Sequence, residues 1–85
     1  MMSILEQKTQ LRGKRTELEA RRKKADAKAI NALMTIQIKA GKYVEKPTDL
    51  DDTAIVTAAE DLRDQLAICR ECEHHIDNID RQLHG

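Results

Sequence analysis

The sequence predicts an all-α protein: an antiparallel two-helix coiled-coil hairpin that self-association completes into a four-helix or larger bundle. Small and apolar residues recur every three or four positions over residues 55–83, which is the repeat of a helix wound around another helix. A second long segment, residues 3–40, carries a related pattern. Charged residues make up 35% of the chain, and one proline and three glycines interrupt it, as is typical of long helices.

Length and composition limit the core that the chain can form on its own. The chain has 85 residues, which we expect to form one helical-hairpin domain, and Tyr43 is its single aromatic residue. A short hairpin without aromatic bulk buries little surface. We therefore expect a second copy or a partner protein to complete the core.

The first helix is predicted over about residues 3–40. Ser3 is a good N-cap, Gly41 is placed to be the first residue beyond the helix, and Gly13 is a weak point or a place of close backbone approach. The expected seam mixes small or apolar residues with long cations. Its members are Ile4, Lys8, Leu11, Arg15, Leu18, Arg22, Ala25, Ala29, Ala32 or Leu33, Ile36 and Ala40.

Residues 41–51 form the expected connection, because Pro47 disfavours helical angles at the residue before it. Tyr43 and Val44 are placed to fold back over this end of the hairpin. Asp51 is the expected N-cap of a second helix over about residues 52–83, with Thr48 as an alternative. The expected seam of this helix is Ile55, Ala59, Leu62, Leu66, Cys69, Cys72, Ile76, Ile79 and Leu83.

A connection of this length predicts an antiparallel pairing of the two helices. With the turn centred near residue 46, Arg15 comes opposite Asp77 and Asp80, and Arg22 comes near Arg70 and Glu73. The long cations of the first seam then have carboxylate partners at the open end of the hairpin. We expect these pairs to fix register and orientation more than to add stability.

A second apolar face on the first helix predicts an intermolecular contact. Its residues recur at helical spacing, away from the seam. They are Ala27, Ile30, Met34 and Ile38. One hairpin cannot cover two faces, so we expect self-association near the loop, most simply as a homodimer.

Three residues of the second helix are of metal-binding types, but core packing is the favoured interpretation. Cys69, Cys72 and His75 share helical spacing with Glu71, and two copies across a dimer would supply four zinc ligands. Both cysteines nevertheless fall on the predicted seam, where a thiol packs as a small apolar group. We expect no metal, no cofactor and no catalytic set.

A basic run in the first helix is the candidate for nucleic-acid contact. Residues 12–28 hold eight basic against three acidic side chains, while residues 45–64 hold seven acidic against two basic ones. The basic residues are Arg12, Lys14, Arg15, Arg21, Arg22, Lys23, Lys24 and Lys28. They suit a phosphate backbone, although no aromatic residue is interleaved for base stacking, and a solvated helix face is the favoured interpretation.

Taken together, the sequence favours a non-enzymatic interaction protein. We expect an adaptor, inhibitor or assembly factor of a bacterium or its phage, located in the cytoplasm because neither a signal peptide nor an apolar spanning segment is visible. The alternative is an RNA- or DNA-binding hairpin. A lesser alternative is a small-ligand- or metal-binding bundle, with Lys42, Tyr43, Lys46 and Thr48 as candidate anion contacts in the connection.

Overall fold

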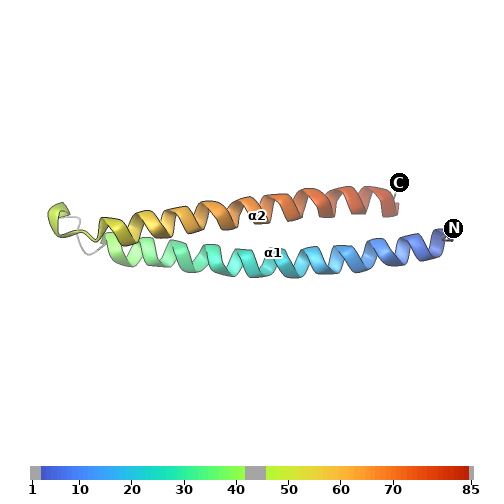
Figure 1. Ribbon diagram of the computed structural model, residues 1–85, viewed down its shortest axis with the longest axis horizontal. Coiled ribbons are helices and arrows are strands. Elements are labelled where there is room, and N and C mark those ends of the chain that lie inside the picture. The colour runs from blue at the N-terminus through green and yellow to red at the C-terminus, as the bar shows by residue number, and fades with distance from the viewer. Residues whose placement is uncertain (1–2, 42–45, 85) are drawn as a thin grey trace.

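The protein is a hairpin of two long antiparallel helices. The computed structural model describes residues 3–41 and 46–84, with helix α1 at Ile4–Gly41 and helix α2 at Asp52–His84. A short 3-10 helix, η1, spans Pro47–Asp49 and leads into α2. The helices lie side by side along a rod of 65 × 17 × 15 Å, with the open ends of both helices at the same end (Figure 1). The prediction of an all-α two-helix hairpin is confirmed.

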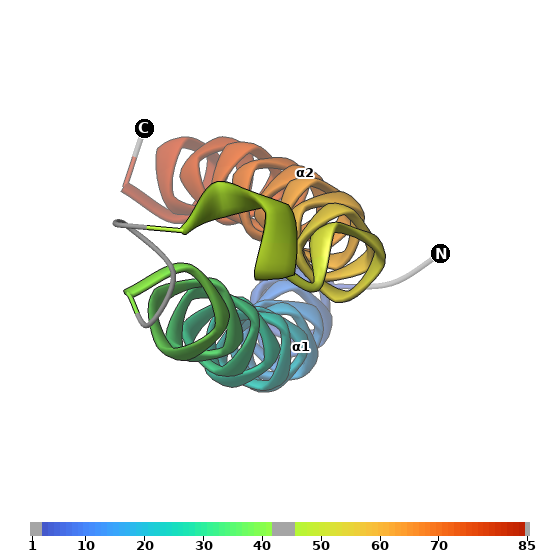
Figure 2. The same ribbon diagram turned by 90° about the vertical axis from the view of Figure 1, so that its left-hand side faces the viewer.

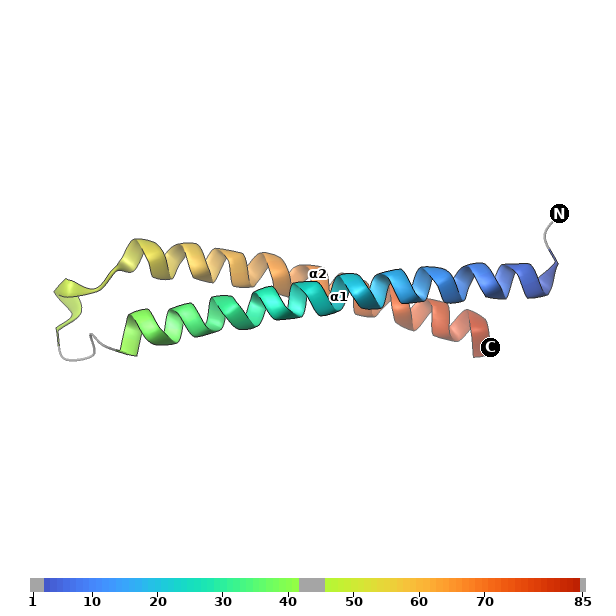
Figure 3. The same ribbon diagram turned by 90° about the horizontal axis from the view of Figure 1, so that it is seen from below.

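The two helices wind around each other. They run side by side in Figure 1, and the view along the rod in Figure 2 shows α1 and α2 as two adjacent cylinders. In Figure 3 they cross near the middle of the hairpin and separate toward both ends. This arrangement is that of a coiled coil, in which crossing keeps one seam of each helix against its partner.

A side chain caps the N-terminus of each long helix. The backbone N–H of Glu6 donates to Ser3 Oγ (3.1 Å), and the N–H of Ala54 donates to Asp51 Oδ1 (3.1 Å). Each bond satisfies an amide that would otherwise lack a partner within its helix, which stabilises a helix by about 1 kcal/mol. Thr48 lies inside η1, so Asp51 is the N-cap of α2.

The expectation for Gly41 is wrong, and one of the two alternatives for Gly13 is excluded. Gly41 is the last residue of α1 rather than the first residue beyond it, and no described residue has the positive φ of a left-handed cap. A Cβ built on Gly13 meets nothing within 4 Å, so no other backbone approaches this glycine. Tyr43 and Val44, which were expected to fold over the end of the hairpin, lie outside the described residues.

The core is a narrow seam of small side chains. Among the described residues the buried ones are Ala25, Ala29, Ala32, Ala58, Cys69, Cys72, Ile76 and Ile79. Seven of these eight are predicted seam positions. The eighth corrects the prediction, because Ala58 is buried while Ala59 is exposed. Starting from Ala58, steps of four and three alternate without interruption through Cys69 and Cys72 to Leu83, so the coiled-coil repeat selects Ala58.

At the open end of the hairpin, the predicted seam of α1 extends beyond the end of α2. Helix α1 has 38 residues and α2 has 33. Ile4 was expected in the seam, but it is 73% exposed, and Leu5 beside it is 70% exposed. The first turn of α1 therefore has no packing partner within the described hairpin.

Candidate interaction surfaces

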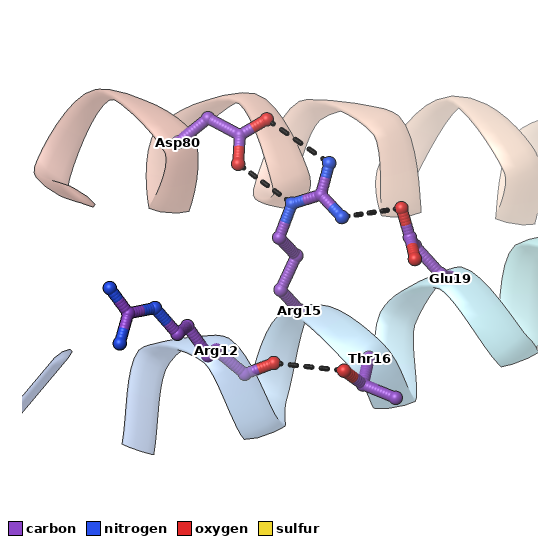
Figure 4. Close-up of polar contacts among 5 residues, drawn as sticks. All are labelled: Arg12, Arg15, Thr16, Glu19 and Asp80. Atoms are coloured by element: carbon purple, nitrogen blue, oxygen red, sulfur yellow. Dashed lines mark hydrogen bonds and ion pairs between the residues drawn. The ribbon is translucent and has the colours of Figure 1, made fainter. Parts of the chain in front are cut away.

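Arg15 joins the two helices at the open half of the hairpin. Its Nε donates to Asp80 Oδ1 (2.7 Å), its second guanidinium nitrogen donates to Asp80 Oδ2 (3.4 Å), and its third reaches Glu19 one turn along α1 (Figure 4). The predicted pairing of Arg15 with Asp80 is present. A forked guanidinium–carboxylate contact restricts geometry more than a single bond does, so it fixes the register of the two helices.

The second predicted cationic contact has a different form. Arg22 and Glu73, both within the described part of the chain, make no ion pair. The contact at this layer uses the backbone of Arg22 instead, because the Cys69 thiol donates to its carbonyl oxygen (Sγ–O 3.8 Å). Arg22 itself is half-buried.

The pKa of Asp80 is lowered by its contact with Arg15. The hydrogen bond from the guanidinium is the largest cause, and it outweighs the opposing effect of desolvation. The same hydrogen bond raises the pKa of Arg15 above its ordinary value. Both shifts favour the charged forms, so the pair is ionic at every pH at which Asp80 remains deprotonated.

This ion pair identifies one side of the hairpin, which we call the Asp80 flank. In a coiled coil, residues seven apart keep the same position relative to the seam. Leu33 lies two such repeats along α1 from Glu19, and Ala59 lies three repeats back along α2 from Asp80. The Asp80 flank is therefore ionic toward the open end and apolar toward the loop.

The loop half of the hairpin carries an exposed apolar surface. Large side chains on it retain between 45% and 58% of their accessible area, although they are hydrophobic. We call the set the loop-end apolar surface: Ala27, Ile30, Leu33, Met34, Ile38 and Val56. The four α1 residues of the predicted second face are all exposed. Leu33 joins this surface because Ala32, the alternative residue for the same seam position, is the one that is buried.

The cysteines belong to the core rather than to a surface site. Cys72 is fully buried and Cys69 is buried, and both are free thiols. His75, the third metal-binding candidate, has a half-exposed side chain whose Nε2 lies 3.8 Å from Glu71. Within residues 3–41 and 46–84, no three side chains of metal-binding type gather at one place. The positions of the two thiols are those that core packing predicts.

The rate at which a thiol reagent modifies the two cysteines tests whether they are buried. Burial is the main cause that raises the pKa of the Cys69 thiol, so less of the reactive thiolate is present, and Cys72 has no exposed surface. We expect a thiol reagent at pH 8 to modify both residues about a hundredfold more slowly in the native protein than in denaturant, because reaction requires local opening. A Gln7→Cys variant supplies an exposed thiol as the control. Equal rates for all three thiols would contradict the buried positions.

The basic run divides between the two sides of α1. Lys14, Arg21 and Lys28 are seven apart and form a row on the side of the seam opposite the Asp80 flank. Arg12, Lys23 and Lys24 are exposed elsewhere on the helix, while Arg15 is engaged by Asp80. The run is therefore not one continuous stripe.

An open groove lies between the helices beside Lys28. Its volume is about 640 Å³, and alanines from both helices lie among polar side chains along it. Its lining residues are Lys28, Asn31, Ala32, Thr35, Ala54, Thr57, Ala58, Asp61 and Gln65. In the connection, the Nζ of Lys46 lies 3.5 Å from Asp49, and the other candidate anion contacts at positions 42 and 43 lie outside the described residues.

Comparisons of the chain with protein-family models, with curated proteins and with solved structures gave no match. Over the described residues, neither α1 nor α2 has a stretch that is long and apolar enough to cross a membrane. The surfaces that distinguish this hairpin are thus the Asp80 flank, the loop-end apolar surface and the row of cations on α1.

Proposed function

We propose that the protein is a non-enzymatic interaction protein that acts by binding another polypeptide through its loop-end apolar surface. The observation that supports this most directly is the exposure of Ile30, Met34 and Ile38, at 49%, 51% and 58%, on one helix of a hairpin whose seam lies elsewhere. Contiguous exposed apolar patches of this kind on soluble domains typically mark interaction sites.

The spacing of these residues suits a helical partner. Ile30, Met34 and Ile38 follow one another at intervals of four, which places them on one face of α1 over two turns. Leu33 widens this face toward α2, where Val56 is exposed at 54%. A helix lying along such a face buries several aliphatic side chains at once.

The chemistry of the seam supports a cytoplasmic location as part of the proposal. Two free thiols lie within one coiled-coil core, and such thiols persist in reducing compartments. An adaptor, an inhibitor and an assembly factor all act through a surface of the kind described here.

A second candidate function rests on the row formed by Lys14, Arg21 and Lys28. Their common side of α1 gives three cations at intervals of about 10 Å, which suits a phosphate backbone. Asp61 of α2 lines the same groove as Lys28 and reduces the positive charge there. We therefore place nucleic-acid binding second.

A pull-down with surface variants tests the first proposal. Tagged full-length chain is incubated with a bacterial lysate, with and without nuclease, beside the variants Met34→Lys and Ala20→Lys. Ala20 is exposed on α1 outside the loop-end apolar surface, so it controls for an added charge. We expect Met34→Lys to lose the polypeptide that the original chain and Ala20→Lys both retain after nuclease treatment.

Either of two results would contradict this proposal. If all three chains retain the same polypeptides in equal amounts, the loop-end apolar surface is not the binding surface. If the recovered material is nucleic acid, and it is lost when Lys14, Arg21 and Lys28 are replaced by glutamine, the cationic row is the functional surface.

A further inference from the structure

The two cysteines of the chain lie together near the centre of the seam. Cys69 and Cys72 occupy consecutive seam positions near the middle of α2, and both are free thiols. Cys72 has no exposed surface, and Cys69 is 7% exposed. The Cys69 thiol also donates across the interface to the carbonyl oxygen of Arg22, near the middle of α1. A chemical change at this pair therefore acts on the part of the seam that joins the two halves of the hairpin.

The spacing of the pair is too wide for a disulfide within the folded helix. Residues three apart in an α-helix have Cβ atoms about 5–6 Å apart, whereas a disulfide needs about 3.5–4.5 Å. Helix α2 is continuous from Asp52 to His84, so it keeps the wider spacing at the two cysteines. Closing the gap requires a change in the helix backbone, and the packed seam around Cys72 resists it. The disulfide and the regular helix are therefore alternative states of this segment.

We propose that Cys69 and Cys72 form a redox-sensitive switch: a disulfide between them forms only while the hairpin is open, and once formed it prevents α2 from packing again on α1. The hairpin is then stable in a reducing environment and is disabled by oxidation. This switch goes beyond the proposed function and does not depend on it.

The oxidant that the reaction needs is a low-molecular-weight disulfide. In the open chain the thiolate of one cysteine attacks a sulfur of this disulfide, which gives a mixed disulfide and releases one small thiolate. The thiolate of the other cysteine then attacks the protein sulfur of the mixed disulfide and releases the second small thiolate. The two protein thiols are oxidised to one disulfide, their two protons pass to the small thiolates, and the oxidant is reduced to two thiols.

The closed hairpin protects the pair from this reaction. Burial is the largest cause that raises the pKa of the Cys69 thiol, and the carboxylates of Asp26 and Glu73 raise it further. The charge of Arg22 opposes these effects without reversing them. The attacking thiolate is therefore scarce while the chain is folded, and the oxidant reaches the sulfur atoms only when the seam opens locally. The rate of oxidation thus follows the fraction of time that the hairpin spends open.

The place of the pair along α2 makes the effect of a disulfide large. Toward the open end lie Ile76 and Ile79, the only large aliphatic side chains among the buried residues of the described chain. Toward the loop α2 buries Ala58. A distortion between these two parts of α2 stops both from packing on α1 in one register. We expect most of the helix to be lost with this packing, because helices in proteins are stabilised mainly by tertiary contacts.

Oxidation in denaturant followed by refolding tests the switch. The original chain is oxidised in urea at mildly alkaline pH with an excess of a small disulfide. The product that lacks two hydrogen atoms and carries no mixed disulfide is identified by mass, purified and returned to buffer. We expect its thermal midpoint, followed by circular dichroism, to lie at least about 10 °C below that of the reduced chain at the same protein concentration. A reducing agent should restore the original midpoint.

A matched control places a disulfide of the same spacing outside the seam. Gln7 and Gln10 are both exposed and lie three apart near the open end of α1. The variant Gln7→Cys with Gln10→Cys, made in a chain whose two seam cysteines are replaced by alanine, can form this disulfide. Its oxidation should lower the midpoint by less than half as much, because it disturbs only the first turns of α1.

The rate of oxidation in native buffer tests the need for opening. Ile76→Ala should speed formation of the disulfide at least about tenfold, because it raises the population of the open chain. If the disulfide forms as fast in native buffer as in urea, the closed hairpin does not protect the pair and the proposal is wrong. A midpoint that oxidation leaves unchanged, or an equal loss in the control, would likewise overturn it.

Discussion

Replacing Ile76 by alanine is expected to lower the free energy of unfolding by about 2–5 kcal/mol, measured by urea denaturation followed by circular dichroism. Ile76 and Ile79 are the only large aliphatic side chains among the eight buried residues of the described chain. The substitution leaves a cavity between the two helices. The helices cannot both move inward to fill it without disturbing the neighbouring layers of the seam. For a chain of this length the loss is a large part of the total stability.

The matched control is the same substitution at an exposed position. Ile4 is 73% exposed in the first turn of α1, so Ile4→Ala should change the free energy of unfolding by less than about 0.5 kcal/mol. Both variants are compared at one protein concentration, so that any self-association contributes equally to the two measured stabilities. Equal losses for the two variants would show that Ile76 does not lie in the seam.

Reversing the charge of Arg15 is expected to lower the thermal midpoint by several degrees, and Asp80→Arg is expected to recover much of that loss. The Arg15→Glu variant places a third carboxylate beside Glu19 and Asp80. In the double variant, an arginine at position 80 faces carboxylates at positions 15 and 19, so the forked contact forms in reverse. Additive losses in the double-mutant cycle would show that the two residues are not coupled.

The same pair gives the protein a defined response to acid. The pKa of Asp80 is lower in the folded chain than its ordinary value of 3.8, because the charged form accepts hydrogen bonds from Arg15. The stabilisation is therefore complete above about pH 4 and is lost as the pH falls through the folded pKa. The stability difference between the original chain and Asp80→Asn should be constant near neutral pH and shrink in acid.

The sequence predicted most of the seam and both helix starts because these follow from local rules. Ser3 and Asp51 have side chains suited to capping, and no stronger cap competes with either of them in the structure. The pairing of Arg15 with Asp80 followed from placing the turn near residue 46. Each of these inferences needs only residue type and spacing along one chain.

The predictions from sequence are wrong where two adjacent residues have a similar character, because spacing alone does not decide which of them is buried. Ala58 and Ala59 are both small, as Ala32 and Leu33 are both apolar, so composition could not decide which one faces the partner helix. The decision depends on the angle at which the helices cross, which every layer of the seam sets jointly. The form of the Arg22 contact, through its carbonyl oxygen and not its side chain, is likewise a consequence of three-dimensional packing.

The antiparallel arrangement also determines how the hairpin responds to tension. Because Ile4 and His84 lie toward the same end of the rod, a force that separates them pulls the helices apart sideways (Figure 1). Layers of the seam then break one after another, with the Arg15–Asp80 contact among the first and the alanine layers near the loop last. Sequential rupture needs less force than shearing all layers at once, so the hairpin would yield as a weak mechanical link when loaded from this end.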